Sequence, residues 1–320
     1  MLDGFDPRSI DWAASLLRDG EVVVFPTETV YGLGADAFNA VAVAKIFELK
    51  KRPHFDPLIV HISEKEWVDR LASRVPAQAR LLMDRFWPGP LTIILEKKEI
   101  IPDIVTAGLS TVGIRMPGHS VALSLIAALA RPIAAPSANP FGYMSTTSAR
   151  HVASLFGNTL PLILDGGPSS YGIESTIVSI YRDEVRVHRH GSISIEELTD
   201  AVGRQVLEKQ PGDVCESPGE LPYHYAPHTP LRIIDNTDAI EVRESAFLAF
   251  KKPAHTVPSK YVEILSEKGD LREAASRFFS CLIELDRKRA GVIYAEKMPE
   301  RGLGKAMMER LEKASRKTGG

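Results

Sequence analysis

Short apolar runs alternate with segments of helical periodicity over residues 8 to 210. The runs "EVVVF", "PLIVHI", "PLTIIL" and "STIVSI" have the length and composition of buried strands, and "AVAVAKIFELK" and "VALSLIAALA" between them predict helices. This alternation is typical of an α/β domain. Two runs within "STIVSIYRDEVRVHRH" are close enough for a hairpin around Arg182 to Glu184, so we expect a mixed sheet rather than a parallel one.

The pattern stops between residues 211 and 230. The stretch "PGDVCESPGELPYHYAPHTP" is dense in proline and glycine and has no period, which predicts a linker. Apolar runs then resume with "LRIID", "AFLAF", "YVEIL" and "GVIYA", together with amphipathic helices from about 269 to 289 and from about 304 to 316. We therefore expect a first domain over 1–210, a linker over 211–230 and a smaller α/β domain over 231–320.

Composition narrows the class of protein. The 320 residues are 44% hydrophobic, which suits one large or two ordinary domains, and the formal net charge of −2 argues against a surface dominated by nucleic-acid contacts. Cys215 and Cys281 are too far apart to indicate a disulfide framework or a zinc site. No run is long enough to span a bilayer, and the first residues lack a secretory pattern, so we expect a cytoplasmic protein without membrane association.

Several familiar motifs are missing from the sequence. We find no GxxxxGK[ST] loop, no HExxH and no nucleophile elbow. "GLGADA" has the spelling of a dinucleotide fingerprint, but Pro26 to Tyr31 separate it from the preceding strand. We interpret Gly32 and Gly34 as turn residues with positive φ.

Two clusters of polar residues follow predicted strands or helices. In "KIFELKKRPHFDPLIVHI", Pro53 should end the helix near Arg52 and present Lys50, Lys51 and Arg52 in a loop. These cations fit an anion clamp, or equally a helix C-terminus facing water. In "PIAAPSANPFGYMSTTSARHV", Ser137, Asn139 and Ser145 are suited to nucleotide phosphates or to turn formation, and Thr147 or Ser148 is a helix N-cap.

A third cluster lies in "DGGPSSYGIESTIVSI" and the following "VHRHGSIS". Ser175 and Thr176 open a strand, and Arg189 closes the next one. His61 also ends a strand. Each could be an ordinary solvated or partly buried residue, but all the clusters fall at strand ends, where open α/β sheets bind their ligands.

The motifs "FPTETVYGLGADA", "KKRPHFDPLIVHI", "FWPGPLTIIL", "VGIRMP", "PIAAPSAN" and "GIESTIV", in this order, resemble those of the L-threonylcarbamoyladenylate synthases with a YrdC-type domain. The linker "SPGELPYHYAP" and the tail "PERGLGKAMMERLEKAS" resemble the long, two-domain form. The resemblance covers essentially the whole chain. It implies a twisted open mixed sheet around a concave cavity, followed by a Rossmann-like C-terminal domain.

The resemblance also implies a reaction. L-threonine, bicarbonate and ATP would give threonylcarbamoyl-AMP, pyrophosphate and water, and separate transferase proteins would carry the group to a tRNA adenosine beside the anticodon. It further implies weak binding of double-stranded RNA. Such chemistry needs positioning and charge stabilisation more than a nucleophile, and hydroxyls with lysine and arginine supply both. No carboxylate cluster suits a protein-held metal, so Mg²⁺ would arrive on the ATP phosphates.

The family pattern implies two groups of site residues, one that binds threonine and one that binds ATP. Lys50 and Arg52 would be catalytic, and Tyr225 in the linker would cover the nucleotide. The threonine-binding residues would be Thr29, His61, Arg115, Ala135 and Ser175, with Arg115 on the substrate carboxylate. The ATP-binding residues would be Lys50, Arg52, Asp56, Thr111, Ser137, Asn139, Ser145, Arg189 and Tyr225.

Two other functions fit the same residues. A carbamoyltransferase of this fold would use carbamoyl phosphate or carbamoyl-AMP, although such proteins carry added domains with paired cysteines. An RNA-binding module would use the concave basic surface, although the net charge argues against it. Dependence on threonine distinguishes the three hypotheses.

Overall fold

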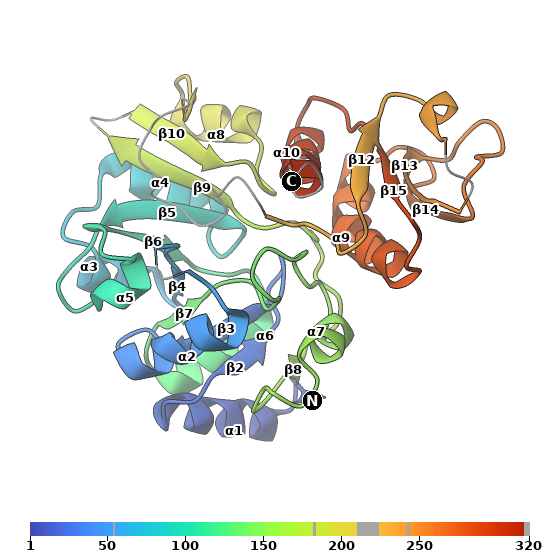
Figure 1. The fold of residues 1–320 in the computed structure, drawn as a ribbon. Coiled ribbons are helices and arrows are strands. Elements are labelled where there is room, and N and C mark those ends of the chain that lie inside the picture. The colour runs from blue at the N-terminus through green and yellow to red at the C-terminus, as the bar shows by residue number, and fades with distance from the viewer. Residues whose placement is uncertain (54, 182–183, 210–223, 242–243, 317–320) are drawn as a thin grey trace.

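Two sheets, one in each half of the chain, organise the protein. The computed structural model describes residues 1–320 apart from 54, 182–183, 210–223, 242–243 and 317–320. The first sheet and its helices form the larger body, and the second sheet lies beside it with two helices between them (Figure 1). Most of the linker predicted over 211–230 is outside the described residues.

The larger sheet is mixed, as predicted. Its order is β11-β10-β9-β5-β6-β4-β7-β3-β2, with parallel pairs β4–β6, β5–β9 and β10–β11 and antiparallel neighbours elsewhere. The predicted hairpin is confirmed as the antiparallel pair β9–β10, whose connecting residues 182–183 are outside the described residues. The strands are β2 (Val23–Phe25), β3 (Gly32–Asp36), β4 (Ile59–His61), β5 (Leu91–Glu96), β6 (Thr111–Arg115), β7 (Ile133–Ala135), β9 (Thr176–Tyr181), β10 (Glu184–Arg189) and β11 (Leu207–Glu208), beside a separate parallel pair of β1 (Leu2–Asp3) and β8 (Leu164–Asp165).

Helices begin and end where local chemistry predicts. Helix α2 ends at Lys50, with Lys51 in the left-handed region, just before Pro53, and Ser148 caps α7 by accepting from the backbone of His151. The helices of this domain are α1 (Pro7–Arg18), α2 (Ala40–Lys50), η1 (Lys65–Trp67), α3 (Val68–Leu71), α4 (Ala77–Phe86), α5 (Asp103–Thr106), α6 (Ser120–Leu129), α7 (Ala149–Phe156) and α8 (Ile195–Val202).

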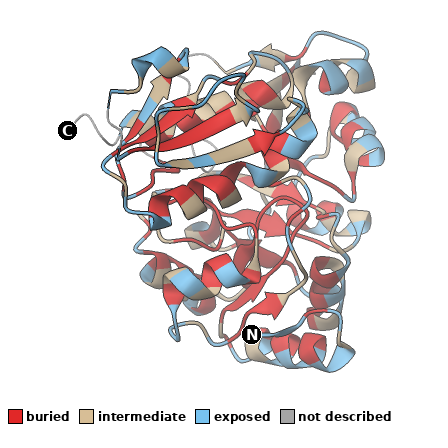
Figure 2. Cartoon of the chain, turned by 90° about the vertical axis from the view of Figure 1, so that its right-hand side faces the viewer, coloured by how far each residue is buried: buried red, intermediate tan, exposed pale blue. Residues whose placement is uncertain are grey.

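Apolar side chains pack on both faces of the sheet. Helices α1 and α6 pack against each other and bury one cluster with Phe25 and Ile133, while α2 and α4 cover a larger cluster. Figure 2 shows the result: buried residues fill the strands and the inward sides of the helices, and exposed residues face outward.

The prediction of a turn at Gly32 and Gly34 is wrong. Both glycines lie in strand β3, opposite Phe25 and Val23, and neither has positive φ. A Cβ on Gly34 would stand 2.6 Å from Ile133 Cγ2 and 2.7 Å from Phe25 Cε1. Glycine is required here because the Phe25 ring and Ile133 occupy the space of a side chain, contacts between strands that a local sequence pattern does not report.

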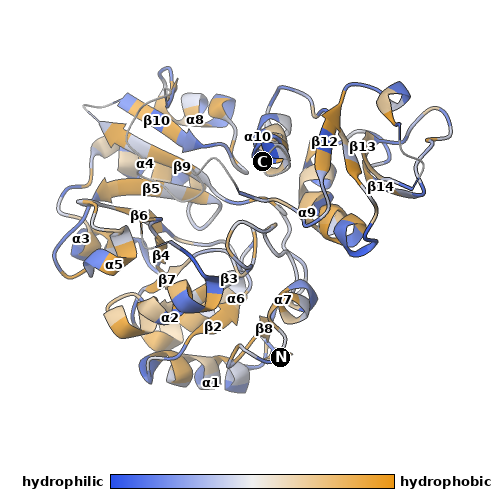
Figure 3. Cartoon of the chain, in the orientation of Figure 1, coloured by the Kyte–Doolittle hydropathy of each residue, from blue (hydrophilic) through white to orange (hydrophobic). Residues whose placement is uncertain are grey.

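The second sheet has four parallel strands in the order β12-β15-β13-β14. The helices predicted near 269–289 and 304–316 are confirmed within two residues at each end. Strands of this sheet are strongly apolar (Figure 3). Its elements are β12 (Leu231–Ile234), η2 (Thr237–Ala239), β13 (Ala246–Lys251), β14 (Tyr261–Ser266), α9 (Leu271–Arg287), β15 (Ile293–Glu296) and α10 (Leu303–Ser315).

Helix α9 joins the two domains through apolar and polar contacts. Phe278 and Phe279 share a buried cluster with Val30, Met144 and Ile173 of the first domain. Hydrogen bonds surround this cluster: Thr147 to Ser280 at 2.8 Å, Arg287 to Ser154 at 2.7 Å and Tyr143 to Asp286 at 2.7 Å. The C-terminal domain is therefore docked beside loops that lead to the edge of the large sheet.

Candidate functional site

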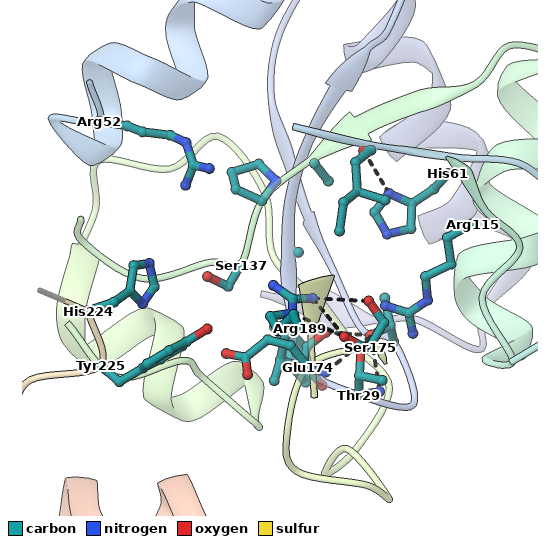
Figure 4. Close-up of a pocket in the computed structure, with 17 residues that line it drawn as sticks. Thr29, Arg52, His61, Arg115, Ser137, Glu174, Ser175, Arg189, His224 and Tyr225 are labelled. Carbon is teal, nitrogen blue, oxygen red and sulfur yellow. Dashed lines mark hydrogen bonds between the residues drawn. The ribbon is translucent and has the colours of Figure 1, made fainter. Parts of the chain in front are cut away.

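A cavity opens where the central strands of the large sheet end. Its empty volume, including the part open to solvent, is about 550 Å³, within the range of small-molecule sites. His61 and Arg115 lie on one side of it, and His224 and Tyr225 lie opposite (Figure 4). The lining residues are Thr27, Thr29, Val30, Tyr31, Gly32, Arg52, Ile59, His61, Arg115, Ala135, Pro136, Ser137, Glu174, Ser175, Arg189, His224 and Tyr225.

Strand register places two of these residues side by side. His61 and Arg115 are the last residues of the parallel strands β4 and β6 and are direct partners in the register. Burial, and after it the charge of the neighbouring Arg115, lower the pKa of His61 to about 3. His61 is thus a neutral imidazole, with Nδ1 3.2 Å from the carbonyl of Ile59, and can donate or accept a hydrogen bond but not neutralise an anion.

The loop after β2 is held rigid by its own hydroxyls. Thr27 Oγ1 donates to the carbonyl of Val30 at 2.6 Å, accepts from the amides of Thr29 and Val30, and lies 2.9 Å from Thr29 Oγ1. Ser169 Oγ donates to the Thr27 carbonyl from a distant loop. The Thr29 hydroxyl is consequently fixed in the cavity wall, as a substrate-positioning group must be.

Arg115 is paired with a buried carboxylate. Its Nη2 donates to Glu28 Oε1 at 2.7 Å, and its Nε lies 3.4 Å from the carbonyl of Gly89. Both side chains of the ion pair are less than a tenth exposed. The pair fixes the guanidinium plane at the cavity, so an incoming carboxylate meets an oriented fork.

Ser175 and Arg189 form a second fixed unit at the start of β9 and the end of β10. Arg189 donates through Nε and Nη2 to the Ser175 carbonyl at 3.1 and 3.0 Å, and Nη2 also reaches Ser175 Oγ at 3.1 Å. Ser175 Oγ is 2.8 Å from Thr92 Oγ1 on β5. This network connects three neighbouring strands below the cavity.

Arg52 lines the cavity and Lys50 supports it from behind. Arg52 forms a buried ion pair with Asp56 at 2.9 Å and donates to the carbonyls of Asp56 and Pro57. Lys50 Nζ donates to the carbonyl of Ser137 at 2.5 Å and to that of Asn139. Burial lowers the pKa of Lys50 well below its usual value, and Arg52 adds to the effect.

Glu174 places a carboxylate in the cavity wall. It accepts a hydrogen bond from Ser145 Oγ and forms an ion pair with Arg310 Nε of α10 at 2.7 Å. Burial alone would raise its pKa, but Arg310 and Arg189 outweigh it and hold the pKa near 2. The carboxylate is therefore ionised throughout the physiological range.

The structure brings nine of the fourteen predicted site residues into the cavity lining: Thr29, Arg52, His61, Arg115, Ala135, Ser137, Ser175, Arg189 and Tyr225. Four others lie behind that lining. Lys50 and Asn139 hydrogen-bond to loop carbonyls, Asp56 pairs with Arg52, and Ser145 donates to Glu174.

Thr111 is in a different place. It is the first residue of β6, the far end from Arg115, and lines a separate smaller cavity with Thr92 and Thr106. The family pattern assigned Thr111 to the ATP site, but only the opposite end of β6, at Arg115, reaches the large cavity.

Four functional candidates were missed by reasoning from the sequence. Glu28, Glu174 and His224 stand inside motifs quoted above, where the neighbouring hydroxyls and tyrosine drew attention instead. Arg310 lies in the last helix with no local signal, because its partner is 136 positions away in the sequence.

The described part of the chain contains no group of three or more histidine, cysteine, aspartate or glutamate side chains that could hold a metal ion. None of its helices has the length and apolar character needed to cross a membrane.

Sequence comparison assigns the family. A family profile described as "Telomere recombination" matches residues 15–191, and another, "Threonylcarbamoyl-AMP synthase, C-terminal domain", matches residues 193–316. The threonylcarbamoyl-AMP synthase of Pyrococcus abyssi is 41% identical, with 95% of this chain and 93% of the relative aligned. The chain belongs to the threonylcarbamoyl-AMP synthase family. The Bacillus subtilis threonylcarbamoyl-AMP synthase is 42% identical over 97% of this chain and 93% of its own.

A solved structure extends the similarity to three dimensions. The crystal structure of P. abyssi Sua5 complexed with L-threonine superposes with a TM-score of 0.89 at 38% identity, covering 98% of this chain and 96% of that one. This threonylcarbamoyl-AMP synthase family member therefore has the two-domain architecture of the long form, and the α/β fold expected from its sequence is confirmed.

Proposed function

We propose that the chain makes threonylcarbamoyl-AMP from L-threonine, bicarbonate and ATP, releasing pyrophosphate and water, and that partner transferases use the product to modify tRNA adenosine next to the anticodon. The observation that carries the proposal is the family membership over the full length, together with the similarity to a protein crystallised with L-threonine. The cavity supports it because its lining holds three arginines, and buried carboxylates fix the guanidinium groups of two of them where anionic substrates would bind.

In this proposal, threonine occupies the side formed by β4 and β6. Arg115 holds its carboxylate, and the hydroxyls of Thr29 and Ser175 with neutral His61 hold its polar groups. The backbone at Ala135 completes this half. The rigid Thr27 hydroxyl network and the Glu28 ion pair support these roles because they fix the donors before substrate arrives.

ATP would occupy the other side, towards the linker. Arg52, Ser137 and Arg189 would contact phosphates, with Tyr225 covering the nucleotide. Lys50, Asp56, Asn139 and Ser145 would act by holding these groups, and Thr111 would contribute through β6 alone. Mg²⁺ would enter on the ATP phosphates, where it binds phosphate oxygens and water. We infer the same division of the chain as above: a catalytic part over 1–210, a gate over 211–230 and a supporting domain over 231–320.

The proposed chemistry balances without a protein nucleophile. The threonine ammonium loses two protons as its nitrogen takes up carbon dioxide and becomes a carbamate. One proton converts bicarbonate into carbon dioxide and water, and the other goes to solvent. A carbamate oxygen attacks the α-phosphorus, the bond to the bridging oxygen breaks, and pyrophosphate leaves with its electron pair. Arginine side chains oppose the charge that develops on phosphate, and the cavity excludes water that would hydrolyse the mixed anhydride.

The test is direct detection of the product. Purified protein receives ATP, Mg²⁺ and bicarbonate, with and without L-threonine, and mass spectrometry follows threonylcarbamoyl-AMP while a coupled assay follows pyrophosphate. We expect both products only with threonine. Threonine-independent pyrophosphate release from folded protein would instead favour the carbamoyltransferase hypothesis.

A further inference from the structure

An arginine of the C-terminal domain reaches the wall of the cavity. Arg310 lies on α10, and its side chain is only 1% exposed. Its Nε donates to Glu174 Oε2 at 2.7 Å, and its Nη1 donates to the carbonyls of Ala306 and His190 at 2.8 and 2.9 Å. The guanidinium also stands over the ring of Tyr225, 5.4 Å from its centroid. The Arg310 guanidinium thus contacts Glu174 in the cavity wall, His190 in the loop between β10 and α8, and Tyr225, which would cover the nucleotide.

The negative charge of Glu174 would oppose the binding of anions in the cavity, and Arg310 neutralises that charge. A buried carboxylate in a cavity for anions would repel phosphate and carboxylate groups strongly, because solvent screens it poorly. Arg189 is also close enough to affect Glu174, but its Nε and Nη2 donors are directed to the Ser175 backbone and hydroxyl. Arg310 is the cation that forms an ion pair with this carboxylate in the described structure.

We propose that Arg310 is a positioning residue for the active site: by neutralising Glu174 and fixing Glu174 and Tyr225, the C-terminal domain sets the affinity of the cavity for polyanionic ATP. The proposal rests on the proposed function for the identity of the ligand. It assigns the second domain a specific task in the site, beyond stabilising the fold.

The geometry supports this role in two ways. Glu174 Oε1 accepts from Ser145 while Oε2 accepts from Arg310, so both carboxylate oxygens are engaged on the protein side. Helix α10 itself is held by apolar packing, since Ala306, Met307 and Leu311 belong to the buried cluster that also contains side chains of the first domain. Arg310 is therefore placed by a docked helix and does not depend on the substrate for its position.

The test measures binding of α,β-methylene-ATP, which cannot release pyrophosphate, and of neutral adenosine to the full-length protein by calorimetry. Arg310→Met leaves the Glu174 charge uncompensated, so we expect about tenfold or greater weakening for the ATP analogue and less than about threefold for adenosine. The double variant Arg310→Met/Glu174→Gln removes both charges, and we expect its affinity for the analogue to return to within about threefold of the wild type.

A matched control separates this effect from loss of domain docking. Lys305→Met removes another cation of α10 that pairs across the domains outside the cavity lining, and it should leave both affinities unchanged. Equal weakening for adenosine and the ATP analogue in Arg310→Met, or no recovery in the double variant, would overturn the proposal.

Two further measurements separate the charge role of Arg310 from misfolding of the variant and from failure of the proposed function. If Arg310→Met does not fold, the binding of Glu174→Gln and of the double variant tests the proposal, since both variants lack the carboxylate charge. We expect each to bind the analogue within about threefold of the wild type or more tightly. Tenfold weaker binding in both would refute the charge role. Wild-type product formation is measured separately, so its failure would reject the proposed function while the charge dependence of binding would still be read.

Discussion

Each arginine of the cavity wall meets a protein acceptor before any substrate arrives. Arg115 pairs with Glu28, Arg52 with Asp56, and Arg189 donates to Ser175. Burying an arginine without a partner is costly, and pairing it also fixes the plane of its five donors. The donors that remain directed into the cavity are then preorganised for anionic groups, at the expense of some positive charge.

Substitution of a single cavity arginine should raise the KM for one substrate and leave the KM for the other nearly unchanged. Arg115→Gln is expected to raise the KM for threonine about 10- to 100-fold, the effect of losing a hydrogen bond between charged groups, with ATP changed little. Arg52→Gln is the matched control, and it should raise the KM for ATP while changing the KM for threonine little. Steady-state kinetics with each substrate varied in turn measures both. Parallel shifts for both substrates in both variants would contradict the assignment of the two halves.

The buried histidines should make stability fall in mild acid. Burial lowers the pKa of His61 and of His224 to about 3, from an ordinary value of 6.5. Between pH 6.5 and 3 the unfolded chain binds protons that the folded chain does not, so the free energy of unfolding decreases as pH falls, by up to about 1.4 kcal/mol per pH unit for each histidine.

Urea unfolding between pH 7.5 and 5 measures this slope. His61→Gln and His224→Gln should each reduce it, whereas substitution of exposed His255 should not. The same argument predicts that threonine binding shows no titration of His61 between pH 6 and 8. An inflection in that range that disappears in His61→Gln would show that the imidazole is charged there.

At the scale of elements, the close approach of one loop to α9 depends on a glycine. Gly172 has φ of +71°, and a Cβ would lie 2.4 Å from the carbonyl oxygen of Ala275. Gly172→Ala should therefore destabilise the protein by about 2–4 kcal/mol, combining left-handed strain with a backbone clash. Gly203→Ala is the control, since its φ is +66° but nothing lies within 4 Å, and we expect about 1 kcal/mol.

Thermal and urea unfolding of the two variants gives the comparison. If Gly172→Ala were no worse than Gly203→Ala, the loop and α9 would not be tightly packed in solution.

Elements were more predictable from the sequence than contacts between them. Apolar periodicity reports which face of a strand or helix is buried, and it located the β9–β10 hairpin and the ends of α2, α9 and α10. It carries no information on partners distant in the chain. The Phe25 ring against Gly34, the pairing of Glu28 with Arg115 and the ion pair of Glu174 with Arg310 all depend on how elements pack, so they were found only in the structure.

At the scale of the whole molecule, one carboxylate of α9 connects both domains with the end of the linker. Asp286 accepts from the hydroxyl of Tyr143 at 2.7 Å and from the amides of His228 and Thr229 at 3.2 and 2.8 Å. The rings of Tyr143 and His228 also pack, with centroids 4.9 Å apart. This anchor lies three residues beyond Tyr225, so it fixes where the chain leaves the cavity.

Asp286→Asn should loosen that anchor while leaving the fold intact. The amide replaces a carboxylate that accepts three hydrogen bonds, and its NH₂ group cannot accept, so we expect faster hydrogen exchange at His228 and Thr229 and a rise in the KM for ATP through less exact placement of Tyr225. Asp270→Asn is the matched control, because Asp270 caps the start of the same helix, on the Glu273 amide, and does not contact the linker. Faster exchange at His228 and Thr229 in both variants would mean that the effect follows helix stability. Unchanged exchange and KM in Asp286→Asn would mean that the linker is held at the cavity by Tyr225 and its packing against Phe279 instead.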